Sequence, residues 1–446
     1  MPRPTSRLRY PVLIGIAAVL STLLGGSWSS VLAAGPSTVV AWNKIAEDTV
    51  VGSGAFQNEG WIYLSYTELA VYDAVVAIAG QYEPYAPKLA APAGADVDAA
   101  VVEAAYETLL ASFPGASAPL ATAYANSLAG IAAGPAKTDG LAVGHAAAQQ
   151  IIAMRTGDGR LTPIGTSSAF PKKAPGPGVW RLTPAAFAQP QTPWVGQVKP
   201  FVVPTADRFM PPPPPALDSP EWAAEYNEVK SLGQNTSTTR TAAQTATAEF
   251  YLANVNRQFN RAVRDLAASR NLDVVETARL AAMVNVVASD AGVSGMNAKY
   301  TYLFWRPVTA IDPTAVTADG FGPVPGFDDG NPATLPQVGW RPLLATPNHP
   351  EYPSAHCTLT SAMTEVFAQF LGTNRFELDL HGFDMNGAAG NLDAVHHFAR
   401  ANDLRAEIVN ARVWAGLHYR GSDEAGSDLG RSVAKYDLKH AFQPVR

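Results

Sequence analysis

Apolar residues recur at helical spacing along most of this chain, and that periodicity limits its fold more than any other feature. The predicted helices span residues 61–78, 97–113, 118–133, 140–154, 221–232, 239–268, 274–300, 358–371 and 392–416. No segment alternates convincingly between apolar and polar residues, as a half-buried strand would. Short loops between the first helices favour antiparallel neighbours. We therefore predict an all-α fold with two helical bundles.

Two stretches rich in proline interrupt the helical pattern. Residues 161–220 include the run Pro211–Pro215, which cannot be helical and is typical of an extended connection. Four aromatic residues favour a strap packed over the bundles rather than a loose linker: Trp180, Phe187, Trp194 and Phe201. A second such loop covers residues 312–350. The predicted division is a leader at 1–34, an N-terminal bundle at 35–160, the connection at 161–220, and a C-terminal bundle with the functional site at 221–446.

The N-terminal residues have the pattern of a secretory signal peptide. Basic residues precede an apolar run from Val12 to Leu24, and Val31–Ala33 offers a small-residue cleavage pattern. Cleavage near Ala33 or Ala34 would give a secreted or periplasmic protein without a stable membrane anchor. An uncleaved anchor is the alternative, but the apolar run is short for a span of about 20 residues.

Composition narrows the functional classes. Charged residues make up 16% of the chain and the net charge is −6, which argues against general binding of nucleic acid or anionic membranes. Cys357 is the one cysteine, so this chain forms no internal disulfide. Its predicted place in the first turn of a helix could lower the pKa of its thiol. Because no nucleophile motif surrounds it, we interpret Cys357 as a small buried residue.

The segment Lys299–Pro307 combines cations with aromatic residues. Lys299 and Arg306 are seven residues apart, so in one helix they would lie within about 20° of each other. Pro307 would then end that helix. A solvated basic face is the alternative. The aromatic residues between the two cations favour burial, and buried cations need an anion.

The segment Pro350–Thr358 predicts a helix N-terminus. Ser354, Ala355 and His356 follow two prolines and open an amphipathic helix, where free N–H groups and the helix dipole favour an anion. Ser354 and the Ala355 amide could donate to one oxygen, and His356 could act as acid or base. Ser354 could equally be a plain helix cap.

Arg412, Gly416 and His418 form a third segment. Arg412 falls in the last turn of a predicted helix, Gly416 lets the chain leave that helix, and His418 follows. A histidine on its own is more often structural. The three segments together supply three cations, a hydroxyl, a helix N-terminus and two histidines. This set suits the binding of a tetrahedral or trigonal-bipyramidal oxyanion.

The order Lys-x6-Arg-Pro, Pro-Ser-x-His and Arg-x3-Gly-x-His resembles the vanadium-dependent haloperoxidase and type 2 phosphatidic acid phosphatase superfamily. The segments Trp305–Ile311, Thr346–Pro353 and Glu68–Ala74 are also similar to bacterial vanadium-haloperoxidase-like proteins. The resemblance covers most of the chain after the leader. It implies an α-helical fold around two four-helix bundles and a vanadate cofactor, with phosphate able to occupy the same site.

The resemblance also implies how the oxyanion is held. Lys299, Arg306 and Arg412 would bind its equatorial oxygens, and Ser354 and the Ala355 amide would add hydrogen bonds. Relatives usually have glycine where this chain has Ala355. The added methyl could crowd the oxyanion or exclude a strained backbone conformation.

The histidines receive separate roles. By resemblance, His356 is the acid–base group, and His418 is the apical vanadium ligand or, in a phosphatase, the phosphorylated nucleophile. His349 occupies a position beside the cofactor that varies with halide preference, although a structural loop histidine is an equal alternative. His396 and His397 are adjacent, so on a helix they would diverge by about 100° and could not easily share a metal ion. We interpret these two as helix-surface residues.

Carboxylate partners for the histidines are less clear from the sequence. Many relatives have an aspartate four residues after the apical histidine, where this chain has Ser422. Asp423 lies one residue further and could orient His418 only if the turn is rearranged. Asp290 is a candidate partner for His356.

The leading hypothesis is a vanadium-dependent haloperoxidase that oxidises halide with hydrogen peroxide at a histidine-bound vanadate. The alternative is an acid phosphatase that acts on a phosphate ester through a phosphohistidine in the same pocket. A hypothesis of another class is a non-catalytic exported oxyanion-binding protein. The sequence leaves halide preference, organic substrate and oligomeric state open.

Overall fold

The computed structural model describes residues 37–162, 173–174, 176–184, 186–314, 329–382 and 394–445. The leader predicted at residues 1–34 therefore lies outside the described residues. The described α-helices are α1 (Ser37–Gly52), α2 (Gln57–Ala79), α3 (Val97–Ser112), α4 (Ser117–Ala129), α5 (Pro135–Arg155), α6 (Pro220–Leu232), α7 (Ala242–Phe250), α8 (Val255–Arg270), α9 (Val274–Tyr302), α10 (Pro307–Ile311), α11 (Ala355–Phe370), α12 (Ala401–Trp414) and α13 (Arg420–His440). Short 3-10 helices lie at Pro114–Ala116 and Pro193–Gln197, and two strands, β1 (Arg375–His381) and β2 (Val395–Arg400), pair antiparallel.

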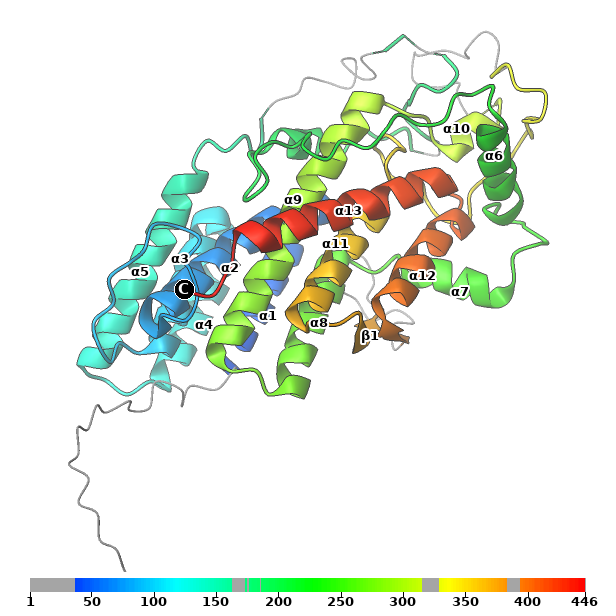
Figure 1. Cartoon of the computed structure of the whole chain (residues 1–446). Coiled ribbons are helices and arrows are strands. Elements are labelled where there is room, and N and C mark those ends of the chain that lie inside the picture. The colour runs from blue at the N-terminus through cyan, green and yellow to red at the C-terminus, as the bar shows by residue number, and fades with distance from the viewer. Residues whose placement is uncertain are drawn as a thin grey trace, which may run out of the picture.

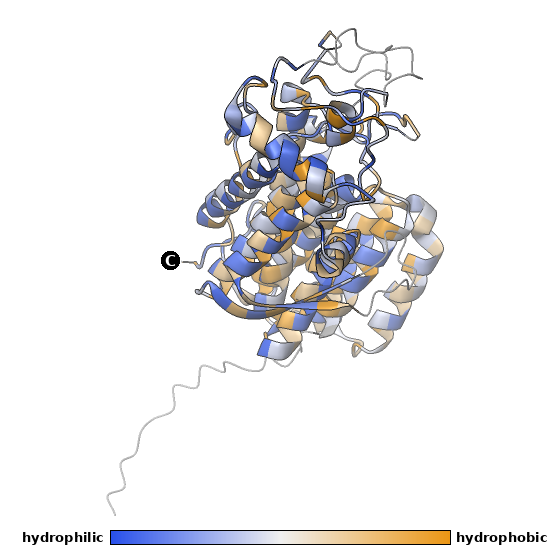
Figure 2. Ribbon diagram, turned by 90° about the vertical axis from the view of Figure 1, so that its right-hand side faces the viewer, coloured by the Kyte–Doolittle hydropathy of each residue, from blue (hydrophilic) through white to orange (hydrophobic). Residues whose placement is uncertain are grey.

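The helices form an elongated molecule (Figure 1). Helices α1–α5 gather at one end, α6, α7, α10 and α12 lie at the other, and α9 and α13 run along the length between them. Helix α2 packs against α3 and α9, and α11 packs against α9 and α13. Most helices carry both apolar and polar stretches (Figure 2), so they bury one side against their neighbours. The predicted helical fold is confirmed.

The structure corrects three helix predictions. Residues 239–268 form two helices, α7 and α8, rather than one. The predicted helix 392–416 is wrong at its start, because residues 395–400 are strand β2 and pair with β1. His396 and His397 are therefore strand residues and not helix-surface residues. Helix α13 is an addition that the apolar periodicity did not indicate.

Small residues explain why α13 escaped prediction. Gly426 and Gly430 approach α11 closely. A Cβ atom at Gly426 would lie 2.5 Å from the Ser354 carbonyl oxygen, and one at Gly430 would lie 2.0 Å from the Thr358 carbonyl oxygen. Glycine therefore takes two positions of the buried side of α13, which it shares with Leu429, Val433 and Leu438. Periodicity of large side chains cannot detect such a helix.

The described part of the proline-rich connection packs against the helices. Trp180 and Phe201 are buried, and Phe187 and Trp194 are partly buried. Asp290 on α9 holds the connection in place: its carboxylate accepts hydrogen bonds from the backbone N–H groups of Phe201, Val202 and Val203, at 2.6, 2.7 and 3.0 Å. The role considered for Asp290, as the partner of His356, is wrong. The domain boundaries stay a prediction.

A buried polar network joins α1, α2, α8 and α9. Asn43 Nδ2 donates to Glu68 Oε1 at 2.8 Å and to Asn260 Oδ1 at 2.7 Å. Asn260 in turn exchanges hydrogen bonds with Asn285, and Arg264 donates to Asn43. Burial raises the pKa of Glu68 to about 7. This network fixes the N-terminal helices on α9, the helix that also carries Lys299.

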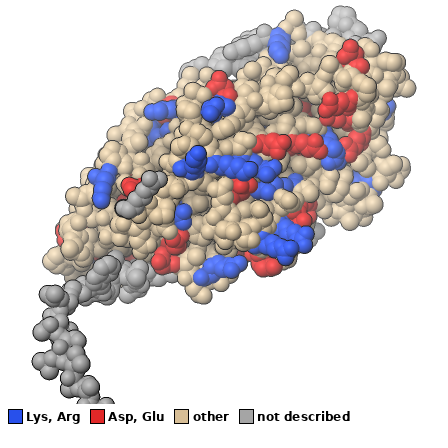
Figure 3. Space-filling model, viewed as in Figure 1, with Lys and Arg blue, Asp and Glu red and all other residues tan. Residues whose placement is uncertain are grey.

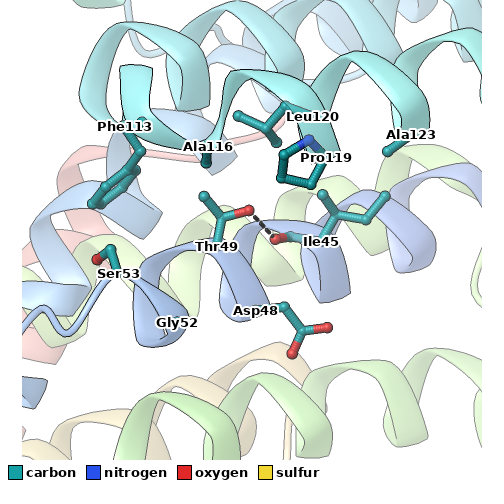
Figure 4. Close-up of a pocket in the computed structure, with 11 residues that line it drawn as sticks. Ile45, Asp48, Thr49, Gly52, Ser53, Phe113, Ala116, Pro119, Leu120 and Ala123 are labelled. Atoms are coloured by element: carbon teal, nitrogen blue, oxygen red, sulfur yellow. Dashed lines mark hydrogen bonds between the residues drawn. The ribbon is translucent and has the colours of Figure 1, made fainter.

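Helix α2 is the one described helix long and apolar enough to cross a membrane. However, 83% of its apolar window is buried inside the molecule. It therefore serves as a core helix. Next to this core, a hollow of about 630 Å³ lies between α1 and α4 (Figure 4), and Ile45, Phe113 and Leu120 give it largely apolar walls.

Replacing Asp290 with alanine should loosen the connection over residues 201–203. Three buried N–H groups would lose their acceptor, at a cost of at least about 1–3 kcal/mol in the free energy of unfolding. Chemical denaturation and limited proteolysis near Phe201 would measure both effects. Asp207→Ala, at an exposed aspartate of the same stretch, is the matched control. Equal stability of the two variants would contradict the anchoring role.

Replacing Glu68 with glutamine should make stability less dependent on pH. The folded-state pKa near 7 exceeds the usual value near 4.5, so the contribution of the neutral carboxyl is complete below pH 4.5 and is lost as the pH rises through 7. Relative to wild type, E68Q should gain up to about 3 kcal/mol across this window. Denaturation between pH 4.5 and 8 checks this, with Glu221→Gln on the exposed side of α6 as control.

Candidate active site

The structure brings the three predicted segments together. Lys299 lies in the last turn of α9, Arg306 directly before α10, Ser354 directly before α11, Arg412 in the last turn of α12, and His418 before α13. All five side chains are buried, none more than 2% exposed. Surface cations are separate from this group: on the face in Figure 3, residues of both charge signs are scattered.

The helical-wheel argument for Lys299 and Arg306 is wrong in its geometry. Helix α9 ends at Tyr302, and Leu303 adopts a left-handed conformation with φ of 52°. Arg306 lies in extended backbone, and Pro307 starts α10 instead of ending α9. The two cations reach one site because the chain turns sharply between them.

Backbone carbonyl groups hold Lys299. Its Nζ donates to the carbonyl oxygens of Pro350 and Glu351, both at 2.9 Å. Burial, and then the nearby charge of Arg306, lowers the pKa of Lys299 well below its usual value. An anion bound beside it would favour the charged form.

Arg306 contacts a ring nitrogen of each of two histidines. Its Nη1 lies 3.1 Å from His418 Nε2, and its Nη2 lies 3.0 Å from His349 Nδ1, which also lies 3.2 Å from the Pro350 carbonyl oxygen. Because a guanidinium can only donate, His418 Nε2 must be an acceptor. His418 therefore carries its proton on Nδ1 and keeps a lone pair on Nε2. His349, a predicted halide-site neighbour, is buried against Arg306.

Helix α11 begins at the site as predicted. Ser354 occupies the N-cap position, but its side chain forms no capping hydrogen bond. The backbone N–H of Ala355, in the first turn, has no acceptor within the helix. Ala355 is helical rather than left-handed. The concern that its methyl excludes a strained backbone does not apply here.

A cavity of about 210 Å³ opens over this helix start. His349, Ala355, His356 and Arg412 are among the residues that line it. The remaining lining residues are Phe56, Gln57, Asn58, Gln191, Tyr251, Leu252, Ala345, Thr346, Pro347, Asn348 and Leu417. Arg412 Nε is buried without a hydrogen-bond partner among the described residues. Burial, and then Arg412, lowers the pKa of His356 well below its usual value, so the neutral imidazole can accept a proton.

The donors present fit an oxyanion such as vanadate or phosphate. Lys299, Arg306 and Arg412 are buried, and within the described residues none of them forms a salt bridge with a carboxylate. Burial of cations without paired anions is costly. The orphaned Arg412 donor and the free amide of Ala355 add hydrogen bonds for oxygens. His418 Nε2 offers a lone pair for a central atom.

Sequence reasoning missed Glu351 as a functional residue. Its Oε1 accepts from His418 Nδ1 at 2.8 Å and from the Tyr419 backbone N–H at 3.2 Å. The suggestion that Asp423 orients His418 is wrong: Asp423 Oδ1 accepts instead from Cys357 Sγ at 3.2 Å. The usable signal was that Glu351 is a carboxylate inside the segment Pro350–Thr358, which the sequence analysis had already singled out. Cys357 is buried, as predicted.

His396 and His397 lie outside the site. On strand β2, His396 stacks on Phe250 and its Nδ1 contacts Glu407 at 2.6 Å. His397 is exposed and contacts Asp379. Neither belongs to the lining of the cavity over α11.

Comparison with known proteins agrees with this geometry. Residues 279–446 match a family model described as the VCPO second helical-bundle domain. The vanadium chloroperoxidase of Curvularia inaequalis is 23% identical over 300 residues, which cover 54% of this chain and 48% of that protein. The match thus spans about half the length of this curated relative.

Solved structures show the same fold over most of the chain. A bacterial vanadium-dependent iodoperoxidase superposes with a TM-score of 0.70 at 20% identity, covering 92% of this chain and 98% of that one. The apo form of a bacterial vanadium-dependent chloroperoxidase gives a TM-score of 0.64 at 15% identity, covering 86% and 94%. Its holo form gives 0.62 at 16% identity, covering 86% and 93%. By sequence the chain is similar to vanadium chloroperoxidase over residues 279–446, and over most of its length it has the fold of bacterial vanadium-dependent haloperoxidases.

Proposed function

We propose that this chain is a vanadium-dependent haloperoxidase that oxidises halide with hydrogen peroxide. One observation carries the proposal: the acceptor nitrogen Nε2 of His418 lies among buried cations, and within the described residues none of these cations forms a salt bridge with a carboxylate. A neutral ligand nitrogen with unpaired positive charges around it suits an anion whose central atom accepts a nitrogen lone pair. Vanadate is such an anion, and the relatives named above are vanadium-dependent enzymes.

In this proposal, some residues bind the oxyanion and another transfers protons. Lys299, Arg306 and Arg412 bind the negatively charged oxygens, and the Ala355 amide and Ser354 hydroxyl add hydrogen bonds at the start of α11. Bound vanadate supplies the activation of hydrogen peroxide toward attack by halide. His356, neutral before anything binds, takes up a proton from the incoming peroxide and returns it to the departing oxygen.

The cavity over α11 supports small reactants. Its volume of about 210 Å³ suffices for hydrogen peroxide and a halide beside the oxyanion. His349 and Arg412 give that side a positive or hydrogen-bonding character, and Phe56 and Tyr251 give the other side an apolar one. We further propose that the enzyme is exported, with residues 1–34 as its signal peptide.

An acid phosphatase is the second candidate function. The same donors would bind a phosphate ester, and His418 Nε2 would serve as nucleophile with His356 protonating the leaving group. The acceptor state of Nε2 supports this alternative equally well. A non-catalytic oxyanion-binding protein needs only the cations.

The deciding experiment is a titration of the purified, metal-free protein with orthovanadate. Oxidation of bromide and iodide by hydrogen peroxide is then measured, with hydrolysis of p-nitrophenyl phosphate in parallel. Vanadate-dependent halide oxidation supports the haloperoxidase. Ester hydrolysis that vanadate inhibits, without halide oxidation, supports the phosphatase. Tight oxyanion binding with neither activity supports the binding protein, and no binding at all contradicts all three.

Arg412→Ala should weaken oxyanion binding. Removing one of the buried cations that would pair with the anion is expected to cost roughly 2–5 kcal/mol. Calorimetry with phosphate and orthovanadate measures the loss. Arg405→Ala is a matched control, because Arg405 is also a buried arginine of α12 but pairs with Glu365 at 2.6 Å. Unchanged affinity in R412A would overturn the site.

His418→Ala should affect vanadate more than phosphate. Both anions keep the cations, but only vanadate loses a bond to nitrogen in the resting site. The ratio of vanadate to phosphate affinity should fall at least by the roughly 10–100-fold typical of losing an outer-shell partner of a metal ligand. The two affinities are measured with the same preparation. An equal loss for both anions would argue against His418 as the vanadium ligand.

A further inference from the structure

We infer that Glu351 is the positioning residue of His418, fixing the ring so that Nε2 presents its lone pair to the oxyanion. The hydrogen bond between them is a property of the protein alone. Its consequence for vanadate rests on the proposed function. In this chain Glu351 would take the part that the family resemblance assigns to an aspartate at the position of Ser422.

The contacts on the two ring nitrogens agree with one another. Arg306 Nη1 donates to His418 Nε2 at 3.1 Å, so the ring proton is on Nδ1. Glu351 Oε1 lies 2.8 Å from that Nδ1 and accepts this proton. Both side chains are buried, with 0% and 1% of their surface exposed. No water can replace the carboxylate easily in such a position.

Glu351 belongs to the second segment of the site and is held by residues of the first and the third. Its backbone N–H donates to the Phe304 carbonyl oxygen at 2.9 Å, and its own carbonyl oxygen accepts from Lys299 Nζ at 2.9 Å. Its side chain also accepts from the Tyr419 backbone N–H, next to His418. A carboxylate fixed in this way has little freedom to follow the ring. It therefore determines where the ring points.

The carboxylates that the sequence analysis considered as histidine partners bind elsewhere. Asp423 accepts from the thiol of Cys357, and Asp290 accepts from the connection at residues 201–203. Ser422 is buried, and its carbonyl oxygen accepts from the Ser354 N–H at 3.0 Å. Among the described residues, Glu351 is the carboxylate that contacts His418.

Two substitutions separate geometry from charge. In Glu351→Gln an amide oxygen can accept from both Nδ1 and the Tyr419 N–H, and that N–H keeps the oxygen turned toward the ring. The tautomer should persist while the negative charge is lost. Glu351→Ala removes both the acceptor oxygen and the negative charge. Asp437→Asn is the control for losing a buried carboxylate elsewhere, since both oxygens of Asp437 are buried without hydrogen-bond partners in the described structure.

The test reads the ring directly in ligand-free protein. Nuclear magnetic resonance of ¹⁵N-histidine-labelled protein, with His418→Gln to assign the signals, reports which nitrogen carries the proton. Wild type, D437N and E351Q should show a proton on Nδ1, and the Nδ1 proton of E351Q should move upfield because its acceptor is neutral. In E351A the Nδ1 proton loses its acceptor, so its signal should shift further upfield and broaden through faster exchange with water, while Arg306 still donates to Nε2. An unchanged spectrum in E351A and E351Q overturns the proposal, and E351Q alone decides it if E351A does not fold.

Binding of orthovanadate and of inorganic phosphate forms the second readout. E351A should lose about 10–100-fold in vanadate affinity, as outer-shell deletions commonly do. E351Q should recover part of this loss, and phosphate affinity should change less than vanadate affinity. Equal vanadate affinity in wild type and E351A would overturn the positioning role. If wild type binds no vanadate, the proposed function fails. The ¹⁵N-histidine spectra of the ligand-free proteins then still decide the role of Glu351.

Discussion

The burial of three cations that form no salt bridge with a carboxylate of the described residues is the constraint on which the rest of the site depends. Removing a guanidinium from water costs several kcal/mol, and only partners fixed in advance can offset this cost. In this protein the hydrogen-bond partners of Arg306 are carbonyl oxygens and two histidine nitrogens. These neutral partners satisfy its hydrogen bonds, and the nearby Glu351 offsets part of its charge. Three cations close together still favour an anion in the pocket.

Backbone groups do much of this positioning, and their arrangement follows from chain turns rather than from helices. Leu303 reverses the chain after α9, and Gly416, with φ of 77°, lets it leave α12 toward His418. A Cβ at Gly416 would lie 2.4 Å from the Gly233 carbonyl oxygen. Glycine at this position is thus required by both conformation and space. Such turns place cations, carbonyls and imidazoles within one pocket.

The sequence predicted the helical fold and the membership of the site better than its geometry. Lys299, Arg306, Ser354, Arg412 and His418 were identified from residue type and order, because a buried oxyanion site needs those groups. The single helix drawn through Lys299 and Arg306 was wrong, since spacing alone cannot reveal a left-handed residue at Leu303. Glu351 was missed because its function depends on a contact across 67 positions of the chain. Helix α13 was missed because glycines take two of the close-contact positions on its buried side and leave fewer large apolar residues to show the period.

Helix α9 connects the packing of the N-terminal helices with the site. Its residues run from Val274 to Tyr302, whereas the matched family domain starts at residue 279, inside the helix. Near its middle, Ser289 bonds to Ser65 of α2 at 2.7 Å, and Lys299 near its far end reaches the anion site. A fragment cut at the domain boundary would lose the first turn of this helix and expose the side that α2 covers. Helix α9 therefore takes part both in the packing of the N-terminal helices and in the site, and cutting it at residue 279 would disturb both.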